Sequence, residues 1–193
     1  MNYLNCLAYW VLAVNPKGLS KVRFAKTLYF SHKSLVMKNL AAVNDLAFIR
    51  MPLGPVPVGF KELGATAGID IQTLSVGLSY NKEQYFLDLQ IRKSIAKDER
   101  LRIIDILTKN LQNFSTSQLV EVSHKENSWR THSNGQEYYI DNVDLRKLIP
   151  SDPEEQLSQQ EDIQKLQARL IEGMLEDIVA ETTALEYPPT SEA

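Results

Sequence analysis

The segment that decides the fold, residues 20–37, has the sequence SKVRFAKTLYFSHKSLVM. Ser20 is a favourable N-cap residue, so we expect a helix from Lys21 to about Met37. Phe24 and Phe30 lie outside the main apolar stripe, and we therefore predict that this helix is buried on more than one side. The stripe itself has the spacing of one helical face and consists of Val22, Ala25, Leu28, Tyr29, His32, Leu35 and Val36.

Further helices are expected on both sides of this segment. The predicted ranges are residues 2–14, 98–111, 115–124 and 142–148. The first helix ends before Pro16 and Gly18, because proline cannot continue the hydrogen-bond ladder and glycine relaxes the turn. The third begins at a capping box, in which Ser115 is followed three residues later by Gln118. Asp141 can cap the last one.

Two β-hairpins complete the predicted elements. The first pairs residues 73–79 with residues 84–89, which have the composition of strands. The second turns at Asn134-Gly135, a strong two-residue turn, between residues 131–132 and 137–140. The expected fold class is therefore mainly α within α+β. It is a compact multi-helix domain with one or two small β-hairpins and a long C-terminal amphipathic helix.

Residues 51–57, MPLGPVP, contain three prolines and one glycine. These residues favour extended and turn geometry, and proline is tolerated in the first turn of a helix. We therefore expect a helix from about Pro55 or Pro57 to Ala67. Two interpretations stay open: a rigid elbow that presents apolar side chains to a partner, or a tight connection that packs them into the core. The candidate partner contacts are Leu53, Pro55 and Val56.

An acidic extension follows Pro150. Residues 1–150 carry 19 basic and 13 acidic side chains, a net charge of +6, whereas residues 151–193 carry two basic and 11 acidic ones, a net charge of −9. We therefore divide the chain into a domain, 1–150, and a helical extension, 151–193. The helix either docks on its own domain or, as we favour, is a partner-binding or dimerising helix that fits a groove. Its predicted anchors are Leu166, Leu170, Met174 and Ile178.

Enzymatic, metal and nucleic-acid chemistry find little support in the sequence. Cys6 is the single cysteine and the three histidines are scattered, which excludes a Cys-based zinc site. Without a GxSxG, HExxH or phosphate-binding glycine motif, an enzyme hypothesis depends on His32 or His124, for which core and helix-end roles are favoured. The basic residues form no run, and the apolar stretch 4–14 is shorter than the roughly 20 residues of a membrane span. We expect a cytoplasmic protein with no cofactor, metal, nucleic acid or membrane partner.

Three groups of residues, taken in chain order, resemble one protein family. Residues 26–31 (KTLYFS) are similar to its Lys-x-Leu-Tyr-Phe-Ala signature, and residues 53–56 (LGPV) to its aromatic-Gly-Pro-Val segment. Residues 123–124 (SH), with Trp129 five residues on, are similar to its Ser-His…Trp ending. The family is that of the Panacea domain, which includes SocA-like antitoxins and phage-associated proteins of the GepA type. The resemblance covers about residues 5–148.

The resemblance implies a mostly helical domain without enzymatic activity, which neutralises a toxin by direct binding. The first hypothesis is therefore the antitoxin of a bacterial or prophage type II toxin–antitoxin system, with a cognate protein toxin as its partner. SocA-like members can instead deliver the toxin to a protease, which makes a protease a second candidate partner. The alternative hypothesis is a non-enzymatic adaptor or a homodimeric structural protein without a dedicated toxin.

Overall fold

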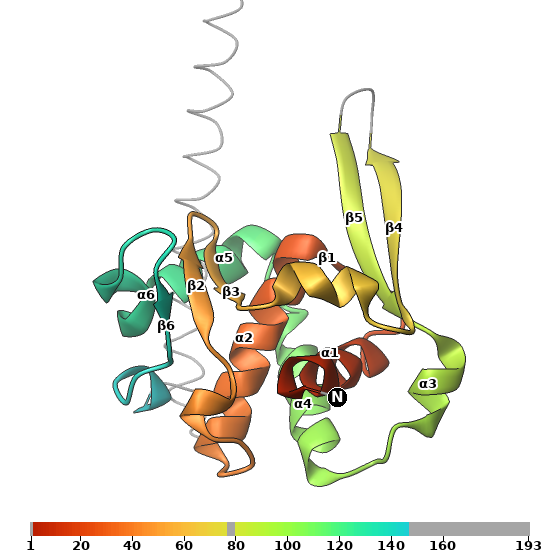
Figure 1. The fold of residues 1–193 in the computed structure, drawn as a ribbon, viewed down its shortest axis with the longest axis horizontal. Coiled ribbons are helices and arrows are strands. Elements are labelled where there is room, and N and C mark those ends of the chain that lie inside the picture. Colours follow the sequence, from red (N-terminus) through yellow and green to blue (C-terminus); the bar gives the residue numbers. More distant parts are fainter. Residues whose placement is uncertain (1, 77–79, 147–193) are drawn as a thin grey trace, which may run out of the picture. The chain divides into compact units, whose positions relative to one another are not determined.

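The computed structural model describes residues 2–76 and 80–146. Its α-helices are α1 (Tyr3–Ala13), α2 (Lys21–Met37), α3 (Leu89–Ser94), α4 (Glu99–Leu111), α5 (Thr116–His124) and α6 (Asn127–Thr131). Its strands are β1 (Leu19–Ser20), β2 (Phe48–Met51), β3 (Gly54–Pro57), β4 (Ile69–Val76), β5 (Tyr80–Leu87) and β6 (Glu137–Tyr138). The expected combination of helices with small antiparallel sheets is confirmed (Figure 1), whereas the predicted extension, 151–193, lies outside the described residues.

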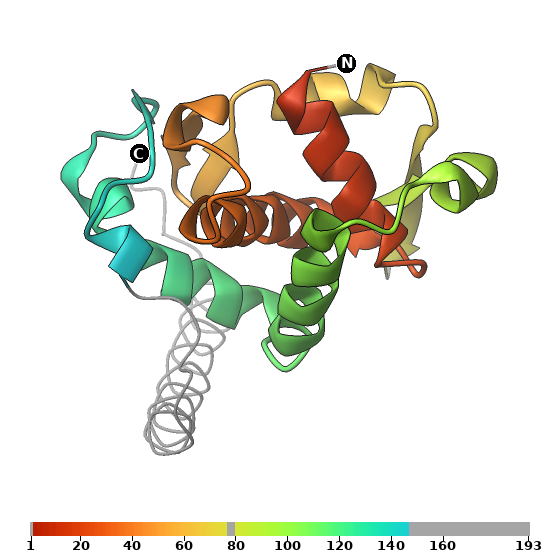
Figure 2. The same ribbon diagram turned by 90° about the horizontal axis from the view of Figure 1, so that it is seen from below.

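Helix α2 lies at the centre of the domain, with α1, α4 and α5 packed around it (Figures 1 and 2). Twelve consecutive residues, Phe24–Leu35, are buried, so the prediction that this helix is covered on more than one side is confirmed. Its aromatic residues pack edge to face, since the ring centroid of Tyr29 lies 5.2 Å from that of Phe30 and 5.0 Å from that of Phe48. A helix covered all round acts as the scaffold on which the other elements are placed.

The starts of α1, α2, α4 and α5 are those that the sequence predicts, although the Ser20 side chain ahead of α2 makes no cap hydrogen bond. Asn2 caps α1 by accepting a hydrogen bond from the Asn5 amide at 2.9 Å, and Asp98 caps α4. The capping box of α5 is present: Ser115 Oγ accepts from the Gln118 amide at 3.2 Å, and Gln118 Oε1 accepts from the Ser115 amide at 2.7 Å. None of the helices in the described part of the chain is long and apolar enough to cross a membrane.

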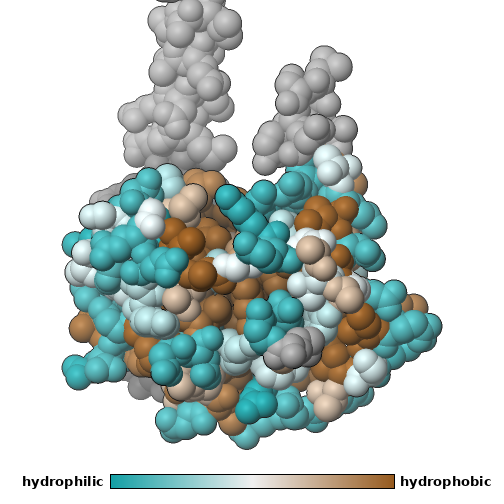
Figure 3. Space-filling model, viewed as in Figure 1, coloured by the Kyte–Doolittle hydropathy of each residue, from teal (hydrophilic) through white to brown (hydrophobic). Residues whose placement is uncertain are grey.

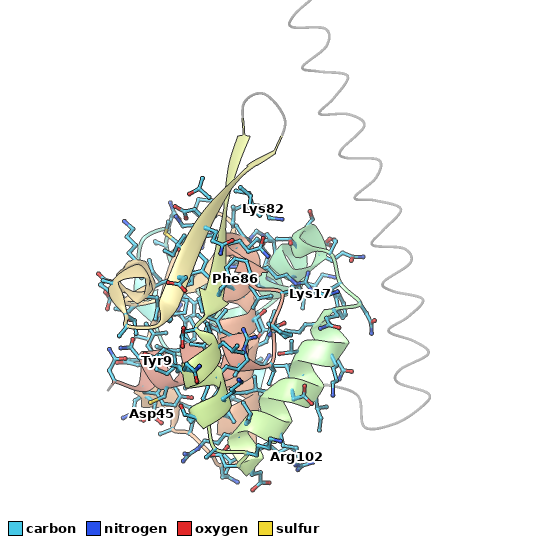
Figure 4. All side chains as sticks on the ribbon, turned by 90° about the vertical axis from the view of Figure 1, so that its right-hand side faces the viewer. Tyr9, Lys17, Asp45, Lys82, Phe86 and Arg102 are labelled. Carbon is cyan, nitrogen blue, oxygen red and sulfur yellow. The ribbon has the colours of Figure 1, made fainter. Side chains whose placement is uncertain are left out.

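The first sheet has the strand order β1-β5-β4. Strands β4 and β5 form the predicted hairpin, but its bounds differ: β4 begins at Ile69 rather than at residue 73, and residues 80–83, the expected turn, belong to β5 and pair with β4. Leu87 opposite Ile69 is buried, so the base of the hairpin belongs to the core. Figure 4 shows the hairpin projecting beyond the helices, with Phe86 closer to the base than Lys82. Helix α3, which follows β5, is not among the predicted elements.

The second sheet has the order β3-β2-β6, and it corrects two predictions. Pro55 and Pro57 do not start a helix but lie in β3, and Phe60–Ala65 is a 3-10 helix that follows Gly59. The prolines fit because they stand two residues apart, at positions whose nitrogens face away from β2. The amide of Val58, the residue after Pro57, faces the opposite way and donates to Ala47 O at 2.9 Å.

The second correction concerns the turn at Asn134-Gly135. The predicted partner strand, residues 131–132, belongs instead to the end of α6 and its C-cap, and β6 pairs with β2. The turn itself is present, because Gly135 has φ of 82° and the Gln136 amide donates to Ser133 O at 3.0 Å. Asp141 then caps a 3-10 helix at Asp144–Arg146. The remainder of the predicted helix 142–148 lies outside the described residues.

Candidate functional site

The three groups of residues that carry the family resemblance meet at Gly54. Lys26 of α2 donates a hydrogen bond from Nζ to Pro55 O at 2.6 Å. A Cβ atom at Gly54 would lie 2.9 Å from both Cε and Nζ of Lys26, and it would overlap Ser123 Oγ of α5. Gly54 also has φ of 90°, which side chains other than that of glycine rarely adopt. The β2–β3 turn is therefore seated directly on α2 and α5, and only glycine fits where they touch.

Lys26 is buried without a carboxylate partner. Its exposed fraction is 1%, and no described acidic group lies within ion-pair distance of it. Burial lowers the pKa of Lys26 to about 7, because the apolar surroundings disfavour the charged amine. The amine is therefore close to half protonated at neutral pH, and both forms can donate the hydrogen bond to Pro55.

A three-layer stack lies beside the turn. The guanidinium carbon of Arg50 lies 4.1 Å from the centroid of the Trp129 ring, and the His124 ring is stacked on Trp129 with centroids 3.9 Å apart and planes 11° apart. The Arg50 guanidinium and the His124 ring both lie too close to the centroid of the Trp129 ring to share one side of it, so they cover its opposite faces. Burial, followed by the charges of Lys26 and Arg50, lowers the pKa of His124 below its usual value. The stack therefore contains one fixed cation and a histidine that is neutral at physiological pH.

The turn ahead of Gly54 is exposed. Met51 is 41% exposed and Leu53 is 56% exposed. The backbone of the turn is nevertheless held, because Trp129 Nε1 donates a hydrogen bond to Met51 O at 3.2 Å. Figure 3 shows apolar surface over the β2–β3 hairpin. We call the group formed by Met51, Pro52, Leu53, Arg50 and Trp129 the turn surface.

The structure places the predicted contact residues differently from one another. Leu53 is exposed, Val56 is half-buried against the core, and Pro55 is buried with its carbonyl bound by Lys26. Both interpretations of the 51–57 segment therefore describe part of it: the turn is presented to solvent and the strand after it packs inward. The four predicted anchors in the extension, Leu166, Leu170, Met174 and Ile178, lie outside the described residues.

A second buried polar group fixes the position of α6, which carries Trp129. Lys33 Nζ and Glu126 Oε2 form an ion pair at 2.7 Å, and Tyr29 donates its hydroxyl to the same carboxylate at 3.2 Å. Burial raises the pKa of Glu126, and the charge of Lys33 opposes that effect. Next to it, Asp144 accepts from the amides of Asn127 at 2.6 Å and Ser128 at 2.9 Å. These bonds anchor the first turn of α6 to the scaffold.

The histidines have structural surroundings. His32 is fully buried, with its Nδ1 3.0 Å from the Tyr3 hydroxyl and its Nε2 3.4 Å from Val43 O. Burial lowers the pKa of His32 to about 4, so the ring is neutral at physiological pH. Across residues 2–76 and 80–146, no three His, Cys, Asp or Glu side chains gather in an arrangement that could hold a metal ion.

Sequence reasoning missed Arg50, Lys33 and Glu126 as members of these groups. Lys26 and Lys33 both lie within the helix that the sequence predicts to be buried on more than one side. Their seven-residue spacing, which keeps two residues on one face, could have marked them as needing partners. Nothing in the sequence marks Arg50, because its position over Trp129 depends on the long-range pairing of β2 with β3 and β6.

Comparison with known families gives one match. The family described as antitoxin SocA-like, Panacea domain, matches residues 24–130, which span Lys26, the turn surface and Trp129. The match covers more than half of the chain, and the protein belongs to this family. No curated protein and no solved structure matches the chain.

Proposed function

We propose that this protein is the antitoxin of a toxin–antitoxin pair and that it neutralises its toxin by direct binding, without enzymatic activity of its own. Membership of the SocA-like antitoxin family supports the antitoxin role. The toxin is a protein encoded beside it in a bacterial or prophage type II system, and the complex forms in the cytoplasm. Delivery of the bound toxin to a protease is a further step that the same complex permits.

The observation that carries the binding proposal is the turn surface. Exposed Met51 and Leu53 lie on a turn whose neighbours are fixed by Lys26, Gly54 and Trp129. A rigid turn loses little conformational freedom on binding, so apolar side chains on it contribute more to affinity than the same side chains on a flexible loop. Leu53 and Met51 are therefore anchors of the interface with the toxin, and the predicted anchors of the extension are additional contacts.

The proposal is tested by co-expression with the neighbouring reading frame. The full chain should relieve the growth defect that this frame causes when expressed alone, and the two proteins should purify as one complex. The double variant Met51→Ser, Leu53→Ser should weaken the complex by about 10-fold or more. Ile106→Ser is the matched control, because Ile106 is 45% exposed and lies on α4, which packs against α1 and α2 rather than against the β2–β3 turn.

Three outcomes would count against the proposal. A neighbouring frame that is not toxic and does not bind would contradict the antitoxin role. A complex weakened equally by Ile106→Ser and by the double variant would remove the turn surface from the interface. Turnover of the toxin, or of a small molecule, by the purified antitoxin would contradict the absence of enzymatic activity.

A further inference from the structure

Arg50 is held at an unusually well-defined place in the turn surface. It lies in β2, the central strand of the second sheet, and its backbone is bonded to the chain on the β6 side. The Arg50 amide donates to Gln136 O at 2.9 Å and its carbonyl accepts from the Gly135 amide at 2.8 Å. On the other side it pairs in register with Pro55, whose carbonyl is bound by Lys26. The Cα–Cβ vector of Arg50 is therefore set by the sheet.

The side chain of Arg50 is fixed as well. Its guanidinium lies over the Trp129 ring at 4.1 Å, and its Nε donates to Trp129 O at 3.2 Å. Its two terminal amino groups have no hydrogen-bond or ion-pair partner among the described residues, and they are not enclosed. A guanidinium that uses Nε for its own positioning keeps its paired terminal donors for a carboxylate, which they can bind at two points.

The charges around this guanidinium favour an anion. Lys26 is a second basic group beneath the same turn, because its Nζ donates to the carbonyl of Pro55, the residue paired with Arg50. No described aspartate or glutamate lies within ion-pair distance of Arg50. Met51 and Leu53, the two exposed apolar side chains, follow Arg50 directly in the chain. The turn surface thus offers one oriented cation beside two apolar side chains.

We propose that Arg50 binds an aspartate or glutamate carboxylate of the toxin, so that the turn surface recognises an apolar segment that carries an acidic side chain. The inference rests on the proposed function and names the chemistry of its partner. The Trp129 ring excludes water from one face of the guanidinium, which strengthens the bond between the guanidinium and a carboxylate. The contact therefore requires the planar, two-pronged guanidinium of arginine at this position. Lysine at position 50 would keep the charge but lose both the stack and the fork.

The experiment measures the affinity of the full chain for the toxin encoded beside it by titration calorimetry. Arg50→Gln should weaken binding by about 10- to 100-fold, and Arg50→Lys should fall near the same value. Arg130→Gln, the matched control, removes the same charge from the exposed surface of α6 and should change the affinity by less than about threefold. Melting temperatures of all variants separate binding from folding.

A scan of the toxin keeps the test independent of the folding of Arg50 variants. Each surface Asp or Glu of the toxin is changed to Asn or Gln, and one of these changes should weaken wild-type binding as much as Arg50→Gln does. Combining that toxin variant with Arg50→Gln should add little further loss, because both remove one contact. If the losses in affinity from Arg50→Gln and from every toxin variant simply add, no toxin carboxylate contacts Arg50, and the proposal is overturned.

The remaining outcomes are distinct. Unchanged affinity of Arg50→Gln with intact wild-type binding overturns this inference and leaves the antitoxin role standing, whereas no binding by the wild type overturns both. If Arg50→Gln converts a dimer into a monomer without affecting toxin affinity, a second copy of the chain occupies the surface. If it tightens toxin binding, the occupant is the acidic segment 151–193 of the same chain. Either result overturns the proposal.

Discussion

Lys26 and Lys33 lie two turns apart on α2, both side chains are buried, and the protein stabilises them in different ways. Lys33 is paired with the carboxylate of Glu126 at 2.7 Å. Lys26 has the Pro55 carbonyl at 2.6 Å and no described acidic partner. The same helix thus accommodates two buried lysine side chains in two ways, one through an ion pair and one through a hydrogen bond to a backbone carbonyl of a turn.

The difference separates a stabilising region from a positioning region. At the Lys33 end, the ion pair and the Asp144 cap hold α6 against the scaffold. Breaking the ion pair should therefore destabilise the whole domain. At the Lys26 end, the hydrogen bond is made to Pro55, next to the turn that carries Met51 and Leu53. Breaking it should therefore change the position of the turn surface. The same helix therefore provides stability at one end and, under the proposed function, fixes the geometry of the binding turn at the other.

The largest expected effect comes from breaking the Lys33 end. Glu126→Gln removes the carboxylate and leaves a buried ammonium without its counter-charge, which should lower the free energy of unfolding by about 3 to 5 kcal/mol. The measurement is urea denaturation followed by circular dichroism. Glu121→Gln is the control, because Glu121 lies 4.0 Å from Lys125 in a surface pair and its removal should cost less than about 1 kcal/mol. Similar losses for both variants would show that the buried pair contributes no more than a surface one.

The next effect concerns the glycine at the Lys26 end. Gly54 and Gly135 have similar φ, 90° and 82°, but a Cβ at Gly135 would meet nothing within 4 Å. Gly135→Ala therefore measures the backbone cost alone, about 1 kcal/mol, while Gly54→Ala adds the collision with Lys26 and Ser123 and should cost about 2 to 4 kcal/mol. Gly54→Val should be worse still. Equal melting temperatures for the two alanine variants would mean that the turn can shift away from α2 at little cost.

The lowered pKa of Lys26 predicts that the free energy of unfolding depends on pH. The unfolded side chain keeps its ordinary pKa of 10.5, whereas burial lowers it to about 7 in the folded protein. Between these values the unfolded chain binds one proton more than the folded chain, so stability rises with pH across that window and is insensitive to this group below it. From about pH 7 to about pH 9 the free energy of unfolding should rise by about 2 kcal/mol.

The variant Lys26→Met should flatten that dependence, since the methionine does not titrate. Both proteins are compared by urea denaturation at several pH values, and the difference between the two curves isolates Lys26 from the other titrating groups. A wild-type stability that falls over the same window, or a Lys26→Met curve parallel to the wild type, would mean that the folded protein holds this lysine charged.

Local signals explain how far the sequence predicts the fold. The starts of α4 and α5 follow from Asp98 and the Ser115–Gln118 box, because a cap and its helix are adjacent in the chain; α2 begins after Ser20 as predicted, although the Ser20 side chain makes no cap hydrogen bond. The hairpin β4–β5 follows from composition. The helix expected after Pro55 is wrong because proline is equally suited to an edge strand, and only the distant partner β2 decides between the two.

The candidate site is less predictable for the same reason. The sequence predicts Leu53 as a contact residue, and its side chain is exposed, but Arg50 becomes part of the surface only through Trp129, which is 79 residues away. The pairing of Lys33 with Glu126 spans 93 residues. A single sequence shows which buried positions need a partner without showing which distant residue supplies it.

The smallest expected effect is that of changing His124. This residue of α5 lies near the Lys26 end of α2 and covers the face of Trp129 opposite Arg50. His124→Ala removes one aromatic contact of a half-exposed ring and should lower stability by about 1 kcal/mol. Arg50 keeps its own face of the indole and its bond to Trp129 O, so toxin neutralisation should remain at permissive temperature. Because burial, together with the charges of Lys26 and Arg50, lowers the pKa of this ring below its usual value, neutralisation by the wild type should not change between about pH 7 and about pH 8 on its account. The checks are the melting temperature and the growth rescue of cells that express the toxin. A fully stable His124→Ala protein that no longer rescues growth would give this histidine a direct role, either in contact with the toxin or in chemistry.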